Sequence, residues 1–422
     1  MKIENFDCIS DVLYGFIKQN DNIDYFGGQK STTLKNLFMK FIREEDYTEK
    51  RNIATDVVKQ IFKMRGKHET AFPFDILMEM EERGTFYKDY RDHVIHTVYV
   101  FLLGYYIYKT NSTIYCEINK RIDYIEKEYI KESGKASSIK ESDKCDYKKI
   151  EDDFLYMWSL ITIYHDYGYV FEHVDDERKI EFFNNLIDVD YSCNNKSYFK
   201  LTKDFDKDAV IKYLTNLNIQ GSTVNGFELI KGISETTNLS NQGCNGLENY
   251  FNFCFDKGIN GREYLDHGII SSLLFMKLSN IVFLERNKSK DDVYIWDESI
   301  QITYFKYVAQ AIAVHNIYVN EANQDTYKIY HLNLGDKDDK NNIYKISVEK
   351  EPFAYLLALC DGLQEWDRKK SVCLNDKSNA EQNELTSRQV KVEVESNGSI
   401  HFYYSLEDID KKGVQNIEEL NT

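Results

Sequence analysis

Proline is nearly absent from this chain, and that scarcity limits the folds it can adopt. Only Pro73 and Pro352 occur among 422 residues. Because proline lacks an amide hydrogen and interrupts helices, long stretches without it can stay helical. Apolar residues recur mostly at three- and four-residue intervals, which is the spacing of one face of an α-helix. The sequence therefore predicts a mainly α-helical protein.

Five segments carry the helical pattern most clearly, namely 90–109, 154–164, 264–285, 301–319 and 352–370. The first two are apolar on most faces, so we expect both helices to lie in the core. Ahead of them, residues 1–89 are expected to form several shorter amphipathic helices. Gly27, Gly28 and Pro73 punctuate this N-terminal region.

Three other stretches depart from the helical pattern. Residues 131–150 are charged and rich in Ser and Lys, which indicates a solvated loop, and 184–262 mix short helical pieces with Asn/Gly-rich turns. Residues 390–395 alternate with period two and are followed by Ser-Asn-Gly-Ser and a second strand-like run at 400–404, which predicts a β-hairpin.

We therefore expect three regions along the chain. A helical extension occupies residues 1–89, and the main domain occupies 90–370 with a long insertion at about 184–262. A tail that carries the β-hairpin follows at 371–422.

Composition narrows the class of protein. The formal net charge of −17 argues against broad, nonspecific binding to nucleic acid, which depends on cationic side chains. None of the eight cysteines forms a Cys-x-x-Cys pair, so we expect reduced thiols and no thiolate zinc site. The first residues are acidic, and no run of about 18 apolar residues occurs. We expect a cytoplasmic protein without a membrane segment.

Histidine and aspartate residues in apolar helical segments indicate where a metal site would lie. The pair His165-Asp166 closes one apolar helical segment, while His93 and His96 lie three residues apart on one face of another. An imidazole nitrogen presented together with a carboxylate suits divalent ions of intermediate softness such as Mn, Fe, Co or Zn. Because a charged or half-satisfied ring is costly in an apolar helix, these histidines are candidates for ligands.

Further candidates follow downstream. His267 and His315 each lie in an apolar helical segment, and Asp361 lies among the leucines of the last one. A lone carboxylate in such surroundings is expensive unless a cation or a metal ion meets it. Asp361 is therefore expected to have a charged or metallic partner.

This order of motifs, a histidine, then His-Asp, then spaced histidines, then a late aspartate, resembles the HD superfamily of metal-dependent phosphohydrolases over about residues 90–370. The resemblance implies an HD-domain helical bundle with the metal ligands His96, His165, Asp166 and Asp361. His96 is preferred to His93 because His96-Thr-Val-Tyr-Val100 matches the His-Ser/Thr-x-x-Val helix of that family. His267 and His315 are similar in placement to the intermediate histidines of two-metal members, which permits a second metal ion.

The resemblance also implies roles. A bound divalent ion, one or two of Mn, Fe, Mg, Co, Ni or Zn, lowers the pKa of a water molecule and polarises the phosphoryl oxygen. We expect Asp166, His93 and His267 in the catalytic set, with His93 passing a proton to the leaving group. Residues beside the ligand positions are expected to contact the phosphate or base of the substrate. These substrate-binding candidates are Arg91, Tyr169, His315, Gln364 and Arg368.

The leading hypothesis is a phosphohydrolase of nucleotides, in its most specific form a deoxynucleoside triphosphate triphosphohydrolase acting in bacterial phage defence. Arg91 and His96-Thr-x-x-Val100 are similar to the first motif of that subfamily. One departure puts its further catalytic histidine in doubt, since this chain has Gly168-Tyr-Val-Phe-Glu-His173 where the subfamily has a Gly-His-x-Pro-Phe-like run. Members of the subfamily often assemble, so the resemblance also implies a homo-oligomer, and a nucleotide effector is a further expected partner.

Three alternatives stay open at this point. A two-metal centre would favour a phosphodiesterase of cyclic nucleotides, cyclic dinucleotides or short oligonucleotides. A helical scaffold could instead sense a nucleotide without catalysis. Mixed His/carboxylate di-iron sites on similar helical folds also perform oxygenation, which keeps an oxidase as the least favoured alternative.

Overall fold

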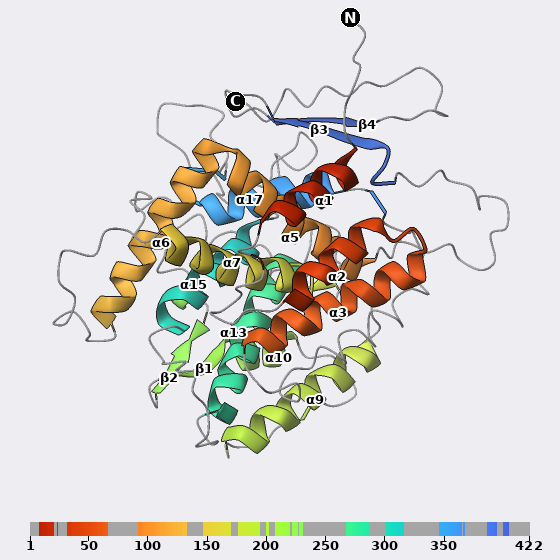
Figure 1. The fold of residues 1–422 in the computed structure, drawn as a ribbon. Helices are drawn as coiled ribbons and strands as arrows, with labels where there is room; N and C mark the ends of the chain where they lie inside the picture. The colour runs from red at the N-terminus through yellow and green to blue at the C-terminus, as the bar shows by residue number, and fades with distance from the viewer. Residues whose placement is uncertain are drawn as a thin grey trace, which may run out of the picture. The chain divides into compact units, whose positions relative to one another are not determined.

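A computed structural model describes residues 8–20, 23, 32–65, 92–132, 147–169, 176–194, 200–201, 207–219, 222–226, 228–230, 267–286, 301–315, 346–364, 366–367, 386–394 and 400–404. This part of the chain is mainly helical, with two small antiparallel sheets (Figure 1). The chain divides into two compact units. Unit 1 comprises residues 1–67, 85–119 and 359–422, and unit 2 comprises residues 68–84 and 120–358.

Unit 1 is built around helix α5 (His93–Thr110). The helices α1 (Ile9–Gln19), α2 (Thr32–Arg43) and α3 (Tyr47–Arg65) pack on one another in sequence order, and both α1 and α3 also contact α5. Strands β3 (Val390–Val394) and β4 (Ile400–Tyr404) form an antiparallel hairpin in which Val390 pairs with Tyr404.

Helix α5 forms because its ends are capped and its interior is apolar. The side chain of Asp92 accepts a hydrogen bond from the Ile95 amide at 2.8 Å, which satisfies a free donor of the first turn. Asn111 ends the helix, and its side chain accepts from the Ile114 amide at 2.9 Å to begin α6 (Ser112–Glu132). Nearly every residue of α5 is buried, as expected of a helix that is apolar all round.

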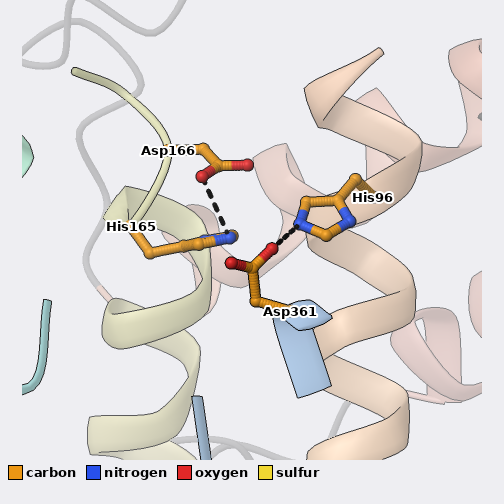
Figure 2. A group of neighbouring side chains, drawn as sticks. All are labelled: His96, His165, Asp166 and Asp361. Atoms are coloured by element: carbon orange, nitrogen blue, oxygen red, sulfur yellow. Dashed lines mark ion pairs between the residues drawn. The ribbon is translucent and has the colours of Figure 1, made fainter. Parts of the chain in front are cut away.

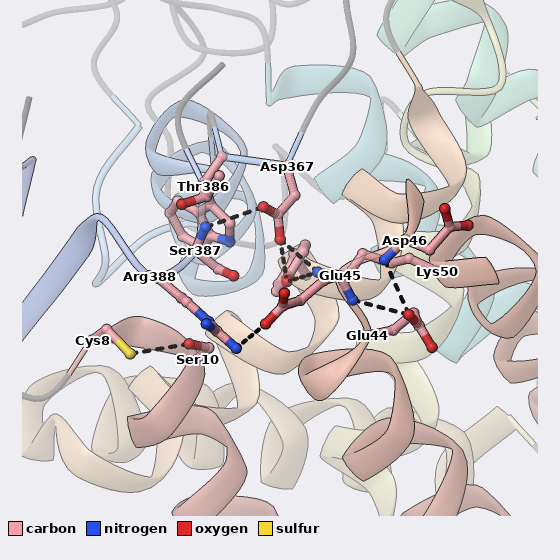
Figure 3. A network of polar contacts seen from close by, with 12 residues as sticks. Cys8, Ser10, Glu44, Glu45, Asp46, Lys50, Asp367, Thr386, Ser387 and Arg388 are labelled. Carbon is pink, nitrogen blue, oxygen red and sulfur yellow. Dashed lines mark hydrogen bonds and ion pairs between the residues drawn. The ribbon is translucent and has the colours of Figure 1, made fainter. Parts of the chain in front are cut away.

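A buried polar network ties the end of unit 1 to its first helices. The carboxylate of Asp367 accepts from Lys50 Nζ at 2.7 Å and from the Ser387 amide at 3.1 Å (Figure 3). It also accepts from the Tyr99 hydroxyl at 2.6 Å. Asp367 also has a φ of 54°, a conformation that residues other than glycine rarely adopt. These three bonds hold the segment before β3 against α3 and α5.

Unit 2 is built around helix α13 (His267–Arg286). Residues 267–281 of α13 are all buried, and the helix packs against α7 (Tyr147–Tyr164), α9 (Asp176–Asn194), α10 (Lys207–Thr215) and α15 (Lys306–Val314). A π-helical turn (η4, Gln301–Phe305) leads into α15. α13 is therefore the central helix of this unit.

A second hairpin, β1 (Asn216–Ile219) with β2 (Ser222–Asn225), lies against α13. The amide of Asn280 on α13 bonds both ways with the backbone of Asn218, donating at 2.8 Å and accepting at 3.1 Å. These bonds satisfy backbone groups at the edge of the small sheet.

Several predictions from the sequence are confirmed. The chain is mainly helical, helices occupy the predicted N-terminal region, and the hairpin at 390–404 has its predicted strands. The HD-domain identity of the bundle stays a prediction. Gly27, Gly28 and Pro73 lie outside the described residues, as does most of 184–262.

Other predictions were wrong at their ends. The loop expected at 131–150 overlaps α6, which continues to Glu132, and α7, which begins at Tyr147; at the end of α6 the charged Lys131 and Glu132 are exposed and continue the solvent face of the helix. The helix expected at 352–370 ends at Leu363. The β1–β2 hairpin was not predicted, since its strands are only four residues long. Within the described residues, no helix combines the length and the apolar character that crossing a membrane requires.

Candidate metal centre

In unit 1, a histidine and an aspartate from distant parts of the sequence meet. His96 lies on α5 and is fully buried, while Asp361 lies on α17 (Pro352–Leu363) with 28% of its side chain exposed. The His96 Nε2 atom is 2.9 Å from Asp361 Oδ1 (Figure 2). The other ring nitrogen, Nδ1, contacts the side-chain oxygen of Gln364. The ring is thus held from both sides within one unit.

In unit 2, His165 and Asp166 form a second pair at the end of α7. The Nδ1 atom of His165 lies 2.8 Å from the carbonyl oxygen of Thr162, three residues back. Its Nε2 atom lies 3.3 Å from Asp166 Oδ1 (Figure 2). The carbonyls of the last helical turn have no partner within the helix, so the imidazole caps one of them.

Asp166 also belongs to a wider group in unit 2. One ligand atom from each of Asp166, His267 and His315 lies within 4.8 Å of the others, and all three residues are buried. His315 repeats the geometry of His165, because its Nδ1 lies 2.5 Å from the Ile312 carbonyl oxygen at the end of α15. Its ring centroid is 5.5 Å from that of His165 and 5.4 Å from that of His267.

The turn after His165-Asp166 is fitted closely to the start of α13. The Gly168 amide donates to Ser271 Oγ at 2.6 Å, and a Cβ atom built at Gly168 would collide with the backbone of His267. The Tyr169 ring stacks on the His267 ring with centroids 3.5 Å apart and planes at 21°. These contacts fix His267 with respect to Asp166, whose Oδ1 is 4.0 Å from His267 Nε2.

The donor set fits a divalent metal ion. A backbone carbonyl can only accept, so the Nδ1 atoms of His165 and His315 donate, and in a neutral ring Nε2 then carries the lone pair. Two atoms bonded to one ion at about 2.1 Å and at right angles lie about 3 Å apart. The 2.9 Å and 3.3 Å separations in the two His–Asp pairs match this spacing. The buried His/Asp groups could therefore hold a metal ion.

Burial also acts on a neighbouring thiol. Cys360 precedes Asp361 on α17 and is fully buried, and burial, with a smaller contribution from the Asp361 charge, raises the pKa of its thiol well above the usual value. Burial therefore keeps the Cys360 thiol protonated at neutral pH.

Most of the site residues predicted from the sequence lie close to one another in two groups, one within unit 1 and one within unit 2. His96 meets Asp361 in unit 1, and His165, Asp166, His267 and His315 gather in unit 2. His93, the first residue of α5, is partly exposed. The substrate-binding candidates Arg91 and Arg368 lie outside the described residues, as does His173.

Some supporting residues escaped the sequence analysis. Gly168 and Ser271 had no assigned role, although Ser271 follows His267 by four positions and so shares its helix face. Gln364 was predicted to contact substrate. In the structure it is fully buried, and its side-chain oxygen and nitrogen both form hydrogen bonds within unit 1.

The chain was also compared with models of protein families, with curated proteins and with solved structures, and none of the three comparisons gave a match.

Proposed function

We propose that this chain is a metal-dependent phosphohydrolase that acts on nucleotides, most specifically a deoxynucleoside triphosphate triphosphohydrolase. One observation carries the proposal: the buried Asp166 and the partly exposed Asp361 lie beside buried histidines whose Nδ1 atoms are tied to acceptors, so that Nε2 is left for a metal ion. Such carboxylate–imidazole sets suit Mn, Fe, Co, Ni or Zn.

The ligands proposed for the first ion are His96, His165, Asp166 and Asp361. Their assignment to one ion comes from the order of motifs in the sequence, which resembles that of HD phosphohydrolases. The geometry inside each pair supports it, because both pairs hold a nitrogen and an oxygen at the spacing of neighbouring ligands.

When bound there, a divalent ion would supply Lewis-acid chemistry, lowering the pKa of a water molecule and polarising the phosphoryl group. The protein's own groups do the rest. Asp166, buried and next to two histidines, orients the attacking water. His93 is partly exposed at the start of α5, so it can exchange a proton with the leaving group. Arg91 and Arg368 are proposed phosphate contacts.

A second candidate function is a phosphodiesterase of cyclic nucleotides, cyclic dinucleotides or short oligonucleotides. The specific observation in its favour is the group formed by Asp166, His267 and His315, which offers a place for a second ion that shares Asp166 with the first. Two ions can clamp the attacking and the leaving oxygen of a phosphodiester. The partly exposed Tyr169, stacked on His267, offers an aromatic face to a base in either function.

The test is elemental analysis joined to a product assay. Wild type, Asp166→Asn, His96→Gln and the control Ser159→Ala are loaded with Mn²⁺ and supplied with deoxynucleoside triphosphates, ribonucleoside triphosphates and cyclic dinucleotides. Ser159 is a buried polar residue on α7, the helix that precedes His165, and its hydroxyl donates to the Tyr156 carbonyl oxygen at 2.9 Å.

We expect wild type and Ser159→Ala to bind metal and to release triphosphate, while His96→Gln and Asp166→Asn lose the same equivalent of metal. One ion favours the triphosphohydrolase, and two favour the phosphodiesterase. Absence of phosphate, diphosphate or triphosphate release from every nucleotide with Mn, Mg, Fe or Co would refute hydrolysis. Metal binding without turnover would leave a nucleotide sensor.

A further inference from the structure

Gln364 joins the candidate ligand His96 to the backbone beyond α17. Its Oε1 contacts His96 Nδ1, and its Nε2 donates to the Trp366 carbonyl oxygen at 2.6 Å. We propose that Gln364 is a positioning residue, which holds the His96 ring in the form that presents Nε2 to the metal. This inference rests on the proposed function, since it concerns the same metal centre.

The backbone decides which way the amide of Gln364 points. A carbonyl oxygen only accepts hydrogen bonds, so the Trp366 carbonyl must face the NH₂ group of Gln364. The side-chain oxygen then faces His96, and an oxygen without hydrogen can only accept. His96 Nδ1 must therefore carry a hydrogen and donate it. A neutral ring with hydrogen on Nδ1 has its lone pair on Nε2, which is the atom 2.9 Å from Asp361 Oδ1.

A side chain is needed here because the helix offers no free carbonyl. His165 and His315 stand at helix ends, and their Nδ1 atoms reach the carbonyls of Thr162 and Ile312. His96 is the fourth residue of an 18-residue helix, where the preceding carbonyls are used by the helix itself. The same orientation of the imidazole therefore requires an acceptor from elsewhere in unit 1.

Burial makes this acceptor hard to replace. His96 and Gln364 both have no exposed surface, so bulk water does not reach the bond. Removal of the acceptor leaves a buried N–H without its partner, which favours a rotated ring or the other tautomer. Either change takes Nε2 away from the metal, and loss of such a partner of a metal-binding histidine typically weakens metal affinity about 10- to 100-fold.

The experiment titrates the metal-free protein with MnCl₂ in competition with a chromophoric chelator. Gln364→Leu removes the acceptor, whereas Gln364→Glu, as a buried and protonated carboxyl, keeps an oxygen toward His96 and a hydrogen toward the Trp366 carbonyl oxygen. The control is Tyr99→Phe, which removes a buried hydroxyl bond to Asp367 from the same helix, three residues beyond His96. A loss of affinity that came only from general destabilisation would appear in this control as well.

We expect the Kd for Mn²⁺ to rise about 10- to 100-fold in Gln364→Leu. It should change less than about threefold in Gln364→Glu, whose carboxyl still offers an acceptor to His96 Nδ1, and in Tyr99→Phe. The inference is overturned if Gln364→Leu binds like wild type, if Tyr99→Phe loses as much affinity, or if Gln364→Glu is as weak as Gln364→Leu.

A second readout needs no metal. In ¹⁵N-histidine spectra of the metal-free protein, with the His96 signals assigned by their absence in His96→Gln, Nδ1 should carry a hydrogen. A bare Nδ1 would refute the role of Gln364 even if the protein hydrolyses nucleotides. Conversely, a protonated Nδ1 in a chain that binds no metal would refute the proposed function and leave the hydrogen-bond assignment intact.

Discussion

Gly168→Ala should damage unit 2 more than any other glycine substitution that can be judged from the described residues. A Cβ atom at this position would lie 2.6 Å from the Cα atom and 2.7 Å from the carbonyl carbon of His267, and closer still to the carbonyl oxygen. Ordinary contact begins at 3.4 Å, so clearing the His267 Cα atom alone requires the backbone of one segment to move by 0.8 Å. Neither the turn nor the helix can move alone without breaking other contacts.

The magnitude follows from what must shift. Overpacking of a core costs about 1–3 kcal/mol, and the upper end applies because the obstacle is the backbone of α13. Displacement also strains the bond from the Gly168 amide to Ser271, at a further cost of about 1 kcal/mol. For a unit of this size, a total of about 4 kcal/mol lowers Tm by about 8–16 °C. The same movement separates His267 from Asp166, so metal binding in unit 2 should weaken.

The matched control is Gly226→Ala in the same unit. Its Cβ would meet the Leu217 Cδ1 atom at 3.0 Å, and the end of a leucine side chain can rotate away. Thermal melting and urea unfolding of both variants, followed by metal analysis, measure the difference. If Gly168→Ala has the same Tm as Gly226→Ala and binds the same amount of metal, the close approach of the turn to α13 is refuted.

Three further outcomes are expected. Asp367→Ala should lower the free energy of unfolding measured in urea by about 3–5 kcal/mol, because it leaves the buried Lys50 charge uncompensated. The double variant with Lys50→Met should recover part of that loss. Iodoacetamide should label the exposed Cys116 within minutes and leave the buried Cys360, whose thiol pKa is raised, unlabelled until the protein unfolds. Peptide mass spectrometry measures the labelling of each cysteine, and equal labelling of the two would contradict the packing of α17. When the free metal ion is present at 100 times its Kd, its removal with a chelator should lower the free energy of unfolding by about 2.7 kcal/mol. An unchanged Tm would contradict metal binding to the folded state.

Helix positions were predictable where burial is continuous. The segment around His96 is apolar on all faces, and its spacing alone placed His93 and the ligand candidate on one helix. The ends of helices were less predictable. The run 301–319 begins with a π-helical turn, and its α-helix ends at Val314. The Nδ1 atom of His315 lies 2.5 Å from the Ile312 carbonyl oxygen of the last turn, a contact that periodicity does not predict.

The candidate site shows the same division between local and distant information. Histidine and aspartate types, with their order, were enough to nominate the ligands, because few other reasons place them in apolar helices. The fit of Gly168 against His267 was not predictable, since it depends on the approach of two segments separated by about 100 residues. A glycine after His-Asp-Tyr is compatible with many turns, and only the neighbouring backbone shows why a side chain is excluded.

The orientation of each imidazole depends on how far away its acceptor lies in the sequence. His165 and His315 follow helices, so a carbonyl three residues back is within reach of Nδ1, and the nitrogen left for a metal can be predicted from the end of the helix. His96 lies inside a helix, and its acceptor Gln364 is 268 positions away. The Gln364 amide is oriented in turn by the Trp366 carbonyl, so the ring form of His96 is fixed only when Asp361 and Gln364 have reached it. Metal binding by His96 should therefore be lost earlier during urea unfolding of unit 1 than the helix content of α5.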